Sequence, residues 1–199
     1  MHNSPVQLVL ATHNSHKVDE LRRILGPALD GIELLGYDGP EPVEDGDTFE
    51  ANALIKARAA AEFTGLPAIA DDSGISVDAL GGAPGIHSAR YAGTRDDADN
   101  VALLLSNLGS SYDRTAQFSC AAALVLPGVT PVERVVLGIW HGTVLHEAVG
   151  VGGFGYDPIF VPDGLSVSSA ELSPDEKNAI SHRAIAFGFL MPIVRSNLL

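Results

Sequence analysis

The chain has 199 residues, of which 46% are hydrophobic, 19% charged and 6% aromatic. This composition is typical of a globular protein and excludes general disorder, and the length favours a single domain over residues 1–199. The formal net charge is −13, from 12 Lys and Arg against 25 Asp and Glu, which disfavours binding to nucleic acid or to an anionic membrane surface.

Three further features favour a cytoplasmic location. The apolar run from Val6 to Ala11 is too short for a signal peptide, and no apolar run reaches the length of a membrane span. Cys120 is the only cysteine, so it cannot form an intrachain disulfide. Its apolar neighbours, FSCAAALVL, predict a core position for it.

The first half of the chain alternates predicted strands and helices. Apolar runs and apolar residues at helical spacing predict, in chain order, a strand at 7–12, a helix at 17–25, a strand at 32–35, a helix ending at about Phe63 and a strand at 67–70. The second helix follows a Pro-rich, acidic loop, and Asp47 with Glu50 has the spacing of a capping box at its start. Ser73 and Gly74 predict a turn directly after the last of these strands.

The second half contains a predicted antiparallel hairpin. Ala116–Leu126 and Glu133–Leu145 are β-compatible stretches separated by a turn rich in proline and glycine. Helices are predicted at 96–108, from SPDE at 173–176 and from Ser181, and glycine-rich loops at 81–85 and 150–155. We therefore expect an α/β fold with a mixed sheet covered by helices, and not a purely parallel doubly wound sheet.

The sequence THNSHK, from Thr12 to Lys17, lies where the first predicted strand becomes a helix. Backbone NH groups at a helix start and a nearby lysine are suited to binding phosphate oxygens. The glycines of the GxxxxGK[ST] pattern are missing, so a Walker-type nucleotide hydrolase is a poor match. The structural alternative is Asn14 as a helix cap and Lys17 as a solvated side chain.

Two adjacent carboxylates, Asp71 and Asp72 in ADDSG, follow the strand at 67–70. Neighbouring side chains of an extended strand point to opposite faces, so both acids reach one point only if the chain turns there. One carboxylate would then bind Mg²⁺ or polarise a water, with Glu44 or Asp45 as the second ligand. The alternative is a pair of acids that cap a turn.

The loop GGFGYDP, from Gly152 to Pro158, places two aromatic residues and an acid among glycines. Phe154 or Tyr156 is a candidate stacking platform for a flat ligand, with Asp157 accepting hydrogen bonds from the ligand's edge. The alternative is a loop packed over the core.

Three cations gather in KNAISHR, at Lys177, His182 and Arg183, in an otherwise acidic protein. Their position near two predicted helix starts favours recognition of an anion or a polar base. A surface lysine and a core histidine are the alternative. No Ser-His-Asp triad is recognisable, and no zinc-ligand spacing is present among His13, His16, His141 and His146.

Together and in chain order, the motifs TxNxxK, ADDSG, VDALGGAPGIHSARYAG, GGFGYDPIF and ELSPDEKNAISHR closely resemble those of the house-cleaning nucleoside triphosphate pyrophosphatases that act on ITP, dITP and XTP. The resemblance extends from about Leu8 to about Phe187. It implies an elongated mixed sheet flanked by helices, in two lobes with the active site between them, and usually a homodimer. The implied activity is Mg²⁺-dependent hydrolysis of a deaminated purine nucleoside triphosphate to monophosphate and pyrophosphate, which keeps such nucleotides out of DNA and RNA.

The resemblance also implies roles for particular residues. Asp72 matches the family's catalytic acid and, with Glu44, its metal ligands. The substrate-binding positions correspond to Thr12, His13, Asn14, Ser15, His16, Lys17, Lys56, Ser73, Phe154, Gly155, Tyr156, Asp157, Lys177, His182 and Arg183. The chain departs from the family pattern at His13, where Gly is common, and in TFEANA, where TFxENA is usual and the acid moves from position 51 to Glu50.

Two other functions fit the same motifs. One is a related pyrophosphatase of the same fold that acts on modified pyrimidine nucleotides. The other is a nucleotide-binding sensor without turnover, which the presence of Asp72 and Lys17 disfavours. The expected partners are small nucleoside triphosphates and a second copy of the chain, and neither nucleic acid nor a membrane.

Overall fold

The computed structural model describes residues 5–13 and 15–199. Contacts between Cα atoms divide the chain into two compact units. The first unit is Met1–Asp72, Cys120–Gly138 and Arg183–Leu199, and the second is Ser73–Ser119 and Ile139–His182.

Strands and helices alternate along the first half of the chain, as the sequence predicts. The strands are β1 (Val6–Leu10), β2 (Ile32–Gly36), β3 (Ala68–Val77), β4 (Thr115–Leu126), β5 (Val132–Val144) and β6 (Phe160–Pro162). The helices are α1 (Ser15–Leu25), α2 (Phe49–Thr64), α3 (Asp97–Leu108), α4 (Pro174–Ile180) and α5 (His182–Leu198).

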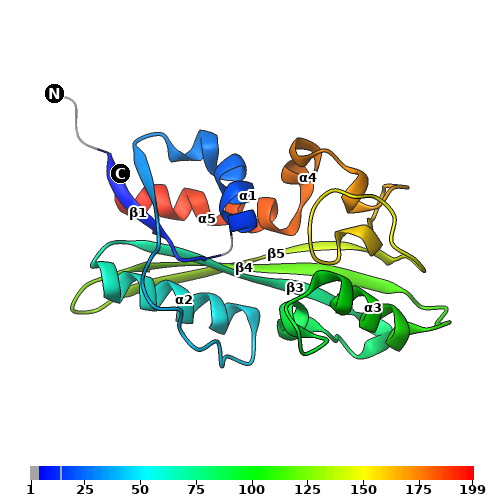
Figure 1. The fold of residues 1–199 in the computed structure, drawn as a ribbon. Helices are drawn as coiled ribbons and strands as arrows, with labels where there is room; N and C mark the ends of the chain where they lie inside the picture. The colour runs from blue at the N-terminus through cyan, green and yellow to red at the C-terminus, as the bar shows by residue number, and fades with distance from the viewer. Residues whose placement is uncertain (1–4, 14) are drawn as a thin grey trace. The chain divides into compact units, whose positions relative to one another are not determined.

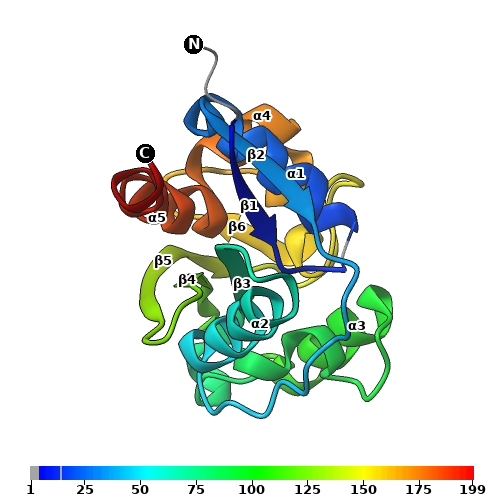
Figure 2. The ribbon, with the colours of Figure 1, turned by 90° about the vertical axis from the view of Figure 1, so that its left-hand side faces the viewer.

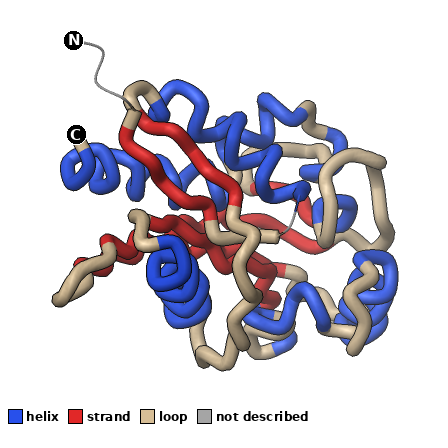
Figure 3. Tube along the Cα trace, turned by 60° about the vertical axis from the view of Figure 1, so that its left-hand side comes forward, coloured by secondary structure: helices blue, strands red, loops and turns tan. Residues whose placement is uncertain are grey.

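The described strands form one six-stranded sheet in the order β2-β1-β3-β4-β5-β6. β1 runs parallel to β2 and to β3, whereas β5 and β6 are antiparallel. Figure 3 shows β1 and β2 side by side in the first unit. The predicted mixed α/β sheet is therefore confirmed, and so is the adjacency of the two hairpin strands β4 and β5.

In the first unit, helices cover both faces of the sheet. Figures 1 and 2 show α1 and α5 on one side of the strands and α2 on the other. The side chains of β1 alternate between these layers, with Leu8 and Leu10 in the apolar cluster that contains Leu21 and Phe187, and Val9 in the cluster that contains the alanines of α2. Burial on both faces explains the uninterrupted apolar run of this strand.

Helix α2 packs on the sheet through small side chains. Ala53, Ala57 and Ala60 are fully buried and recur at helical spacing on one face. Methyl side chains let the helix backbone approach the sheet closely. This approach brings two polar residues of α2, Asn52 and Lys56, within hydrogen-bonding distance of a β3 carboxylate.

The core of the second unit is rich in aromatic residues. Phe118 of β4 stacks with Trp140 of β5 at a centroid distance of 6.5 Å and meets Phe160 of β6 edge-on at 4.7 Å. Gly142 permits this packing, because a Cβ there would overlap the Val161 carbonyl oxygen and the Phe160 ring. The three-residue strand β6 was not predicted, since so short a segment shows no alternation.

Two local predictions are wrong. The predicted turn at Ser73 and Gly74 does not exist, because β3 continues through both residues to Val77. Gly74 instead permits a close approach, since a Cβ there would overlap Ser88 Oγ and Gly85 O. The capping residue of α2 is Thr48 and not Asp47.

In α2 and in α4, a hydroxyl side chain caps the helix by accepting a hydrogen bond from a backbone NH of the first turn. Thr48 Oγ1 accepts a hydrogen bond from Ala51 N at 3.1 Å, and Ser173 caps α4 in the predicted capping box with Glu176.

In residues 5–13 and 15–199, no helix has both the length and the apolar character needed to cross a membrane.

We expect Thr48→Ala to lower the free energy of unfolding by about 0.5 to 2 kcal/mol, because an NH group at the start of α2 loses its acceptor. Asp47→Ala is the matched control and should cost less, since Asp47 does not cap the helix. Urea unfolding of both variants measures the difference. If Asp47→Ala lowered the free energy of unfolding as much as Thr48→Ala or more, Asp47 would be the capping residue of α2 after all.

Candidate active site

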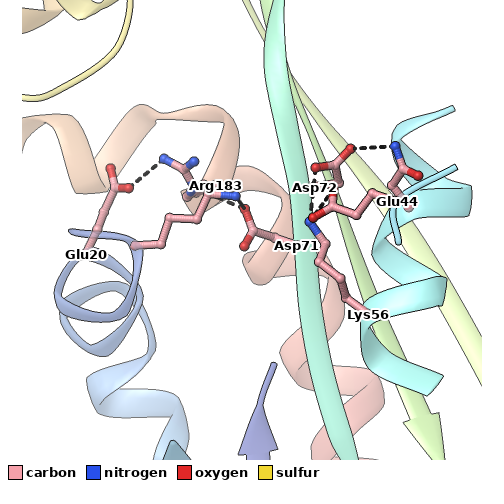
Figure 4. A network of polar contacts seen from close by, with 8 residues as sticks. Glu20, Glu44, Lys56, Asp71, Asp72 and Arg183 are labelled. Atoms are coloured by element: carbon pink, nitrogen blue, oxygen red, sulfur yellow. Dashed lines mark hydrogen bonds and ion pairs between the residues drawn. The ribbon is translucent and has the colours of Figure 1, made fainter. Parts of the chain in front are cut away.

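Asp71 and Asp72 lie on opposite faces of β3. Figure 4 shows Asp71 directed towards Arg183 and Asp72 towards Lys56. The alternation continues from the preceding residues, because Ile69 belongs to the same apolar cluster as Phe187 and Ala70 to the cluster of the α2 alanines. Since the strand does not turn, the two carboxylates belong to two different polar clusters of the first unit.

The Asp72 cluster joins β3, helix α2 and the acidic loop. Lys56 Nζ donates to Asp72 Oδ1 at 3.1 Å and to Glu44 Oε2 at 3.2 Å. Asn52 Nδ2 donates to Asp72 Oδ2 at 3.3 Å, while Asn52 Oδ1 accepts from Gly46 N at 2.9 Å. Asn52 and Lys56 are one helical turn apart, so α2 presents both side chains to the carboxylate.

The charges of the Asp72 cluster do not cancel, since two carboxylates face one ammonium group. Burial raises the pKa of Asp72, and the positive charges of Lys56 and Lys17 oppose this increase without reversing it. Burial lowers the pKa of Lys56, but the carboxylates of Asp72, Asp71 and Glu44 raise it further, so its net change is an increase. The cluster therefore has a surplus of negative charge.

This donor set fits Mg²⁺, which uses one or two protein carboxylates and completes its shell with water and substrate phosphates. Asp72 and Glu44 supply two carboxylates that share one lysine. Asp45, the alternative second ligand, is exposed. Among the residues that the structure describes, no group of three or more His, Cys, Asp or Glu side chains is placed to hold a metal.

The Asp71 cluster has balanced charges, and its members Asp71 and Arg183 are buried. Lys17 Nζ and Arg183 Nε donate to Asp71 Oδ2 at 3.1 and 3.3 Å, and Arg183 Nη1 donates to Glu20 Oε2 at 2.7 Å. Burial raises the pKa of Asp71, but Lys17 and Arg183 lower it by more, so the carboxyl pKa is well below its usual range. Burial lowers the pKa of Arg183, which Glu20 and Asp71 more than offset. Asp71 is therefore held as an anion between two cations.

The phosphate-loop candidate at 12–17 is only partly described. Asn14 lies outside the described residues, and Ser15 and His16 form the first turn of α1. Thr12 is half-buried. His13 is exposed, and its Nε2 donates to Gly39 O at 3.1 Å. Lys17 donates to the buried carboxylate of Asp71, which fixes the position of its ammonium group.

In the second unit, Asp157 organises another polar cluster. Its Oδ2 accepts from Lys177 Nζ at 2.6 Å and from Phe154 N at 2.8 Å, and its Oδ1 accepts from Ser169 Oγ at 2.9 Å. Asp157 and Lys177 are both buried. The Lys177 ammonium lies 5.0 Å from the centre of the Phe154 ring, a cation–π distance. The structure therefore joins the acid of GGFGYDP and the lysine of KNAISHR in one ion pair, which the sequence did not predict.

The structure distinguishes the two candidate stacking residues. Phe154 is half-buried. Tyr156 is 4% exposed, belongs to the aromatic core of the second unit and donates from its hydroxyl to Ser88 O at 2.8 Å. Phe154 is therefore the better platform for a flat ligand, and Tyr156 anchors the loop to the core.

His182 and Ser73 occupy different environments in the second unit. His182 is buried and stacks on Phe118 at a centroid distance of 4.7 Å with an interplanar angle of 9°. It is therefore held as a core histidine, the alternative considered from the sequence. Ser73 is half-buried in β3, immediately after Asp72.

Sequence reasoning missed two residues of the first unit, Asn52 and Glu20. Asn52 is 1% exposed in an alanine-rich helix, and a polar residue on that buried face was an available signal. Glu20 lies on α1, where an acid on a helix gives no signal of a buried partner. The core prediction for Cys120 is confirmed, and burial raises the pKa of its thiol.

These features define an α/β protein with a carboxylate and lysine site suited to a divalent cation and an anionic substrate. Comparisons with known proteins identify its family. The Ham1 family model matches residues 8–193, so the chain belongs to the Ham1 family.

Relatives and solved structures match nearly the whole chain. The dITP/XTP pyrophosphatase of Leifsonia xyli is 58% identical over 195 residues, which cover 96% of each chain. The dITP/XTP pyrophosphatase of Pseudomonas syringae is 50% identical over 92% of this chain and 94% of that protein. The solved structure of a HAM1 protein from Coxiella burnetii is 42% identical, with a TM-score of 0.87 over 96% of this chain and 99% of that one.

We expect neighbouring substitutions in β3 to differ in their effect on stability. Asp71→Asn should lower the free energy of unfolding by about 3 to 5 kcal/mol, because it leaves the buried Arg183 and the half-buried Lys17 without their shared anion. Asp72→Asn should change it far less, because burial already disfavours the ionised form of Asp72. Denaturant unfolding of the two isosteric variants tests this, and an equal loss of stability would contradict the separation into two clusters.

Proposed function

We propose that this protein hydrolyses deaminated purine nucleoside triphosphates, such as ITP, dITP and XTP, to the nucleoside monophosphate and pyrophosphate. The observation that carries the proposal is the Asp72 cluster, in which Lys56 and Asn52 orient a carboxylate that has surplus negative charge around it. Relatives at 50 to 58% identity bear the name dITP/XTP pyrophosphatase, which supports the substrate class.

The catalytic step that we propose is attack of water on the α phosphorus, with cleavage of the bond to the oxygen that leaves with pyrophosphate. Asp72 orients the water and accepts its proton, a role favoured by a carboxyl pKa above the usual value. Lys56 is an electrostatic partner for the charge that develops on the leaving pyrophosphate. Asn52 keeps the carboxylate in one orientation through its hydrogen bond to Oδ2.

Mg²⁺ dependence is part of the proposal, with Asp72 and Glu44 as the protein ligands. Bound there, the ion would neutralise charge on the triphosphate. The surplus of carboxylate over ammonium in this cluster supports the assignment. A homodimer and a cytoplasmic location also belong to the proposal, the first from the family resemblance and the second from the sequence.

Base recognition is assigned to the Asp157 cluster. Hypoxanthine and xanthine present a keto acceptor beside a protonated ring nitrogen, whereas adenine presents an amino donor beside a nitrogen that accepts. Arg183 only donates and the carboxylate of Asp157 accepts, so these residue types together suit the keto purines. Phe154 is the proposed stacking platform.

The test is a substrate panel with Mg²⁺ present or removed by chelation. We expect pyrophosphate release from ITP and XTP to exceed release from ATP by about a hundredfold or more in kcat/KM, because mispaired buried groups each cost about 1 to 3 kcal/mol. Chelation should abolish turnover. Preference for modified pyrimidine triphosphates would favour the related pyrophosphatase, and nucleotide binding without turnover would favour the sensor.

We expect Asp72→Asn to lower kcat for ITP by at least about a hundredfold, since the variant retains the shape of the site but loses its base. ITP should still bind, which calorimetry with the inactive variant measures. Asp45→Asn is the matched control, because it removes an exposed acid next to Glu44. Near-normal turnover by Asp72→Asn would refute the assignment of the catalytic acid.

A further inference from the structure

The loop that carries Phe154 is wound around the carboxylate of Asp157. Asp157 Oδ2 accepts a hydrogen bond from Phe154 N at 2.8 Å. Gly153 has φ +69°, and a Cβ at this position would overlap the same carboxylate. The backbone on the N-terminal side of the Phe154 ring is therefore fixed by an acid within the loop's own sequence motif.

The next amide of this loop is held by an acid from elsewhere in the second unit. Gly155 N donates to Asp97 Oδ2 at 2.7 Å, a short distance typical of a charged acceptor. Asp97 is exposed, lies 58 residues earlier in the chain and occupies the first turn of α3. Two successive NH groups, those of Phe154 and Gly155, thus bind two carboxylates from different segments.

The helix that supplies Asp97 is capped by a different side chain. Asp96 caps α3 by accepting from Ala98 N at 2.9 Å and from Asp99 N at 3.1 Å. Asp99 accepts from Thr94 Oγ1 at 3.0 Å. The cap and the preceding turn are therefore complete without Asp97, whose Oδ2 binds the loop instead.

We propose that Asp97 is a positioning residue. Its hydrogen bond with Gly155 N, here called the latch, fixes the Phe154 loop and so presents the Phe154 ring to the purine base. The inference rests on the proposed function and adds a residue that contacts no substrate. Fixing the backbone on both sides of Phe154 before binding removes part of the entropy cost of ordering the loop around the ligand. Loss of the latch weakens nucleotide binding and leaves the chemical step at Asp72 unchanged.

The first test measures the latch without any substrate. Amide hydrogen exchange at Gly155, followed by NMR, should be about tenfold faster in Asp97→Ala than in the wild-type protein, because the NH loses a charged acceptor. Asp99→Ala is the matched control, since it removes another acid from the first turn of α3 but contacts Thr94 and not the loop. Asp97→Asn retains an acceptor oxygen and should show a smaller change.

The second test measures the effect on substrate. Asp97→Ala should raise KM for ITP by about three- to tenfold with kcat within about twofold of wild type, whereas Asp99→Ala should leave both unchanged. In a Phe154→Ala background, Asp97→Ala should add little to KM, because the two residues act through the same contact. A full additional rise in KM in that background would show that Asp97 does not act through Phe154.

The outcomes separate the latch from the proposed function. Wild-type exchange at Gly155 in Asp97→Ala would overturn the latch, and faster exchange with unchanged KM would overturn its role in presenting Phe154. A fall in kcat equal to the rise in KM would also contradict a positioning role. A wild-type protein that does not hydrolyse ITP would refute the proposed function, and the exchange at Gly155 would then decide the latch by itself.

Discussion

The strict alternation of side chains along β3 is the constraint on which the polar architecture of the first unit depends. Because the strand continues through ADDSG, Asp71 and Asp72 face opposite helical layers. One carboxylate accepts from two cations, and the other shares a single lysine with a second acid. The pKa values of two identical side chains thus shift in opposite directions, because the strand presents them to different neighbours.

The Asp71 and Asp72 clusters differ in net charge and in their role in the fold. The balanced cluster around Asp71 ties α1 and α5 to β3 through Lys17, Arg183 and Glu20, and the desolvation cost of such groups makes it a device for fixing geometry rather than for adding stability. The Asp72 cluster stays partly accessible and negatively charged. Small alanines on α2 make it possible, because larger side chains would hold Asn52 and Lys56 away from the strand.

The second unit also contains a buried carboxylate with several hydrogen-bond donors, and this carboxylate orders a loop. Asp157 is buried and accepts from a lysine, a serine and a backbone NH, so its carboxylate orders a glycine-rich loop that has no secondary structure to support it. Glycines at positions such as 153 are required because the backbone wraps the carboxylate with positive φ and no room for a Cβ. Phe154 is presented by this scaffold, whereas Tyr156 secures it to the core.

The sequence by itself determined the elements and the chemistry of single motifs. Periodicity predicted strands β1 to β5, the helices and the hairpin, and the residue types in SPDE predicted the cap of α4, because these features depend on residues close together in the chain. The order of the motifs indicated the family. Only the tertiary structure decided which residues meet. The local sequence at Gly74 favours a turn, yet Gly74 remains in the strand because the segment at 85–88 packs against it. The contacts of Asn52 with Asp72, of Glu20 with Arg183 and of Asp97 with Gly155 join residues 20 to 163 positions apart, and no local pattern records a partner that folding alone brings into reach.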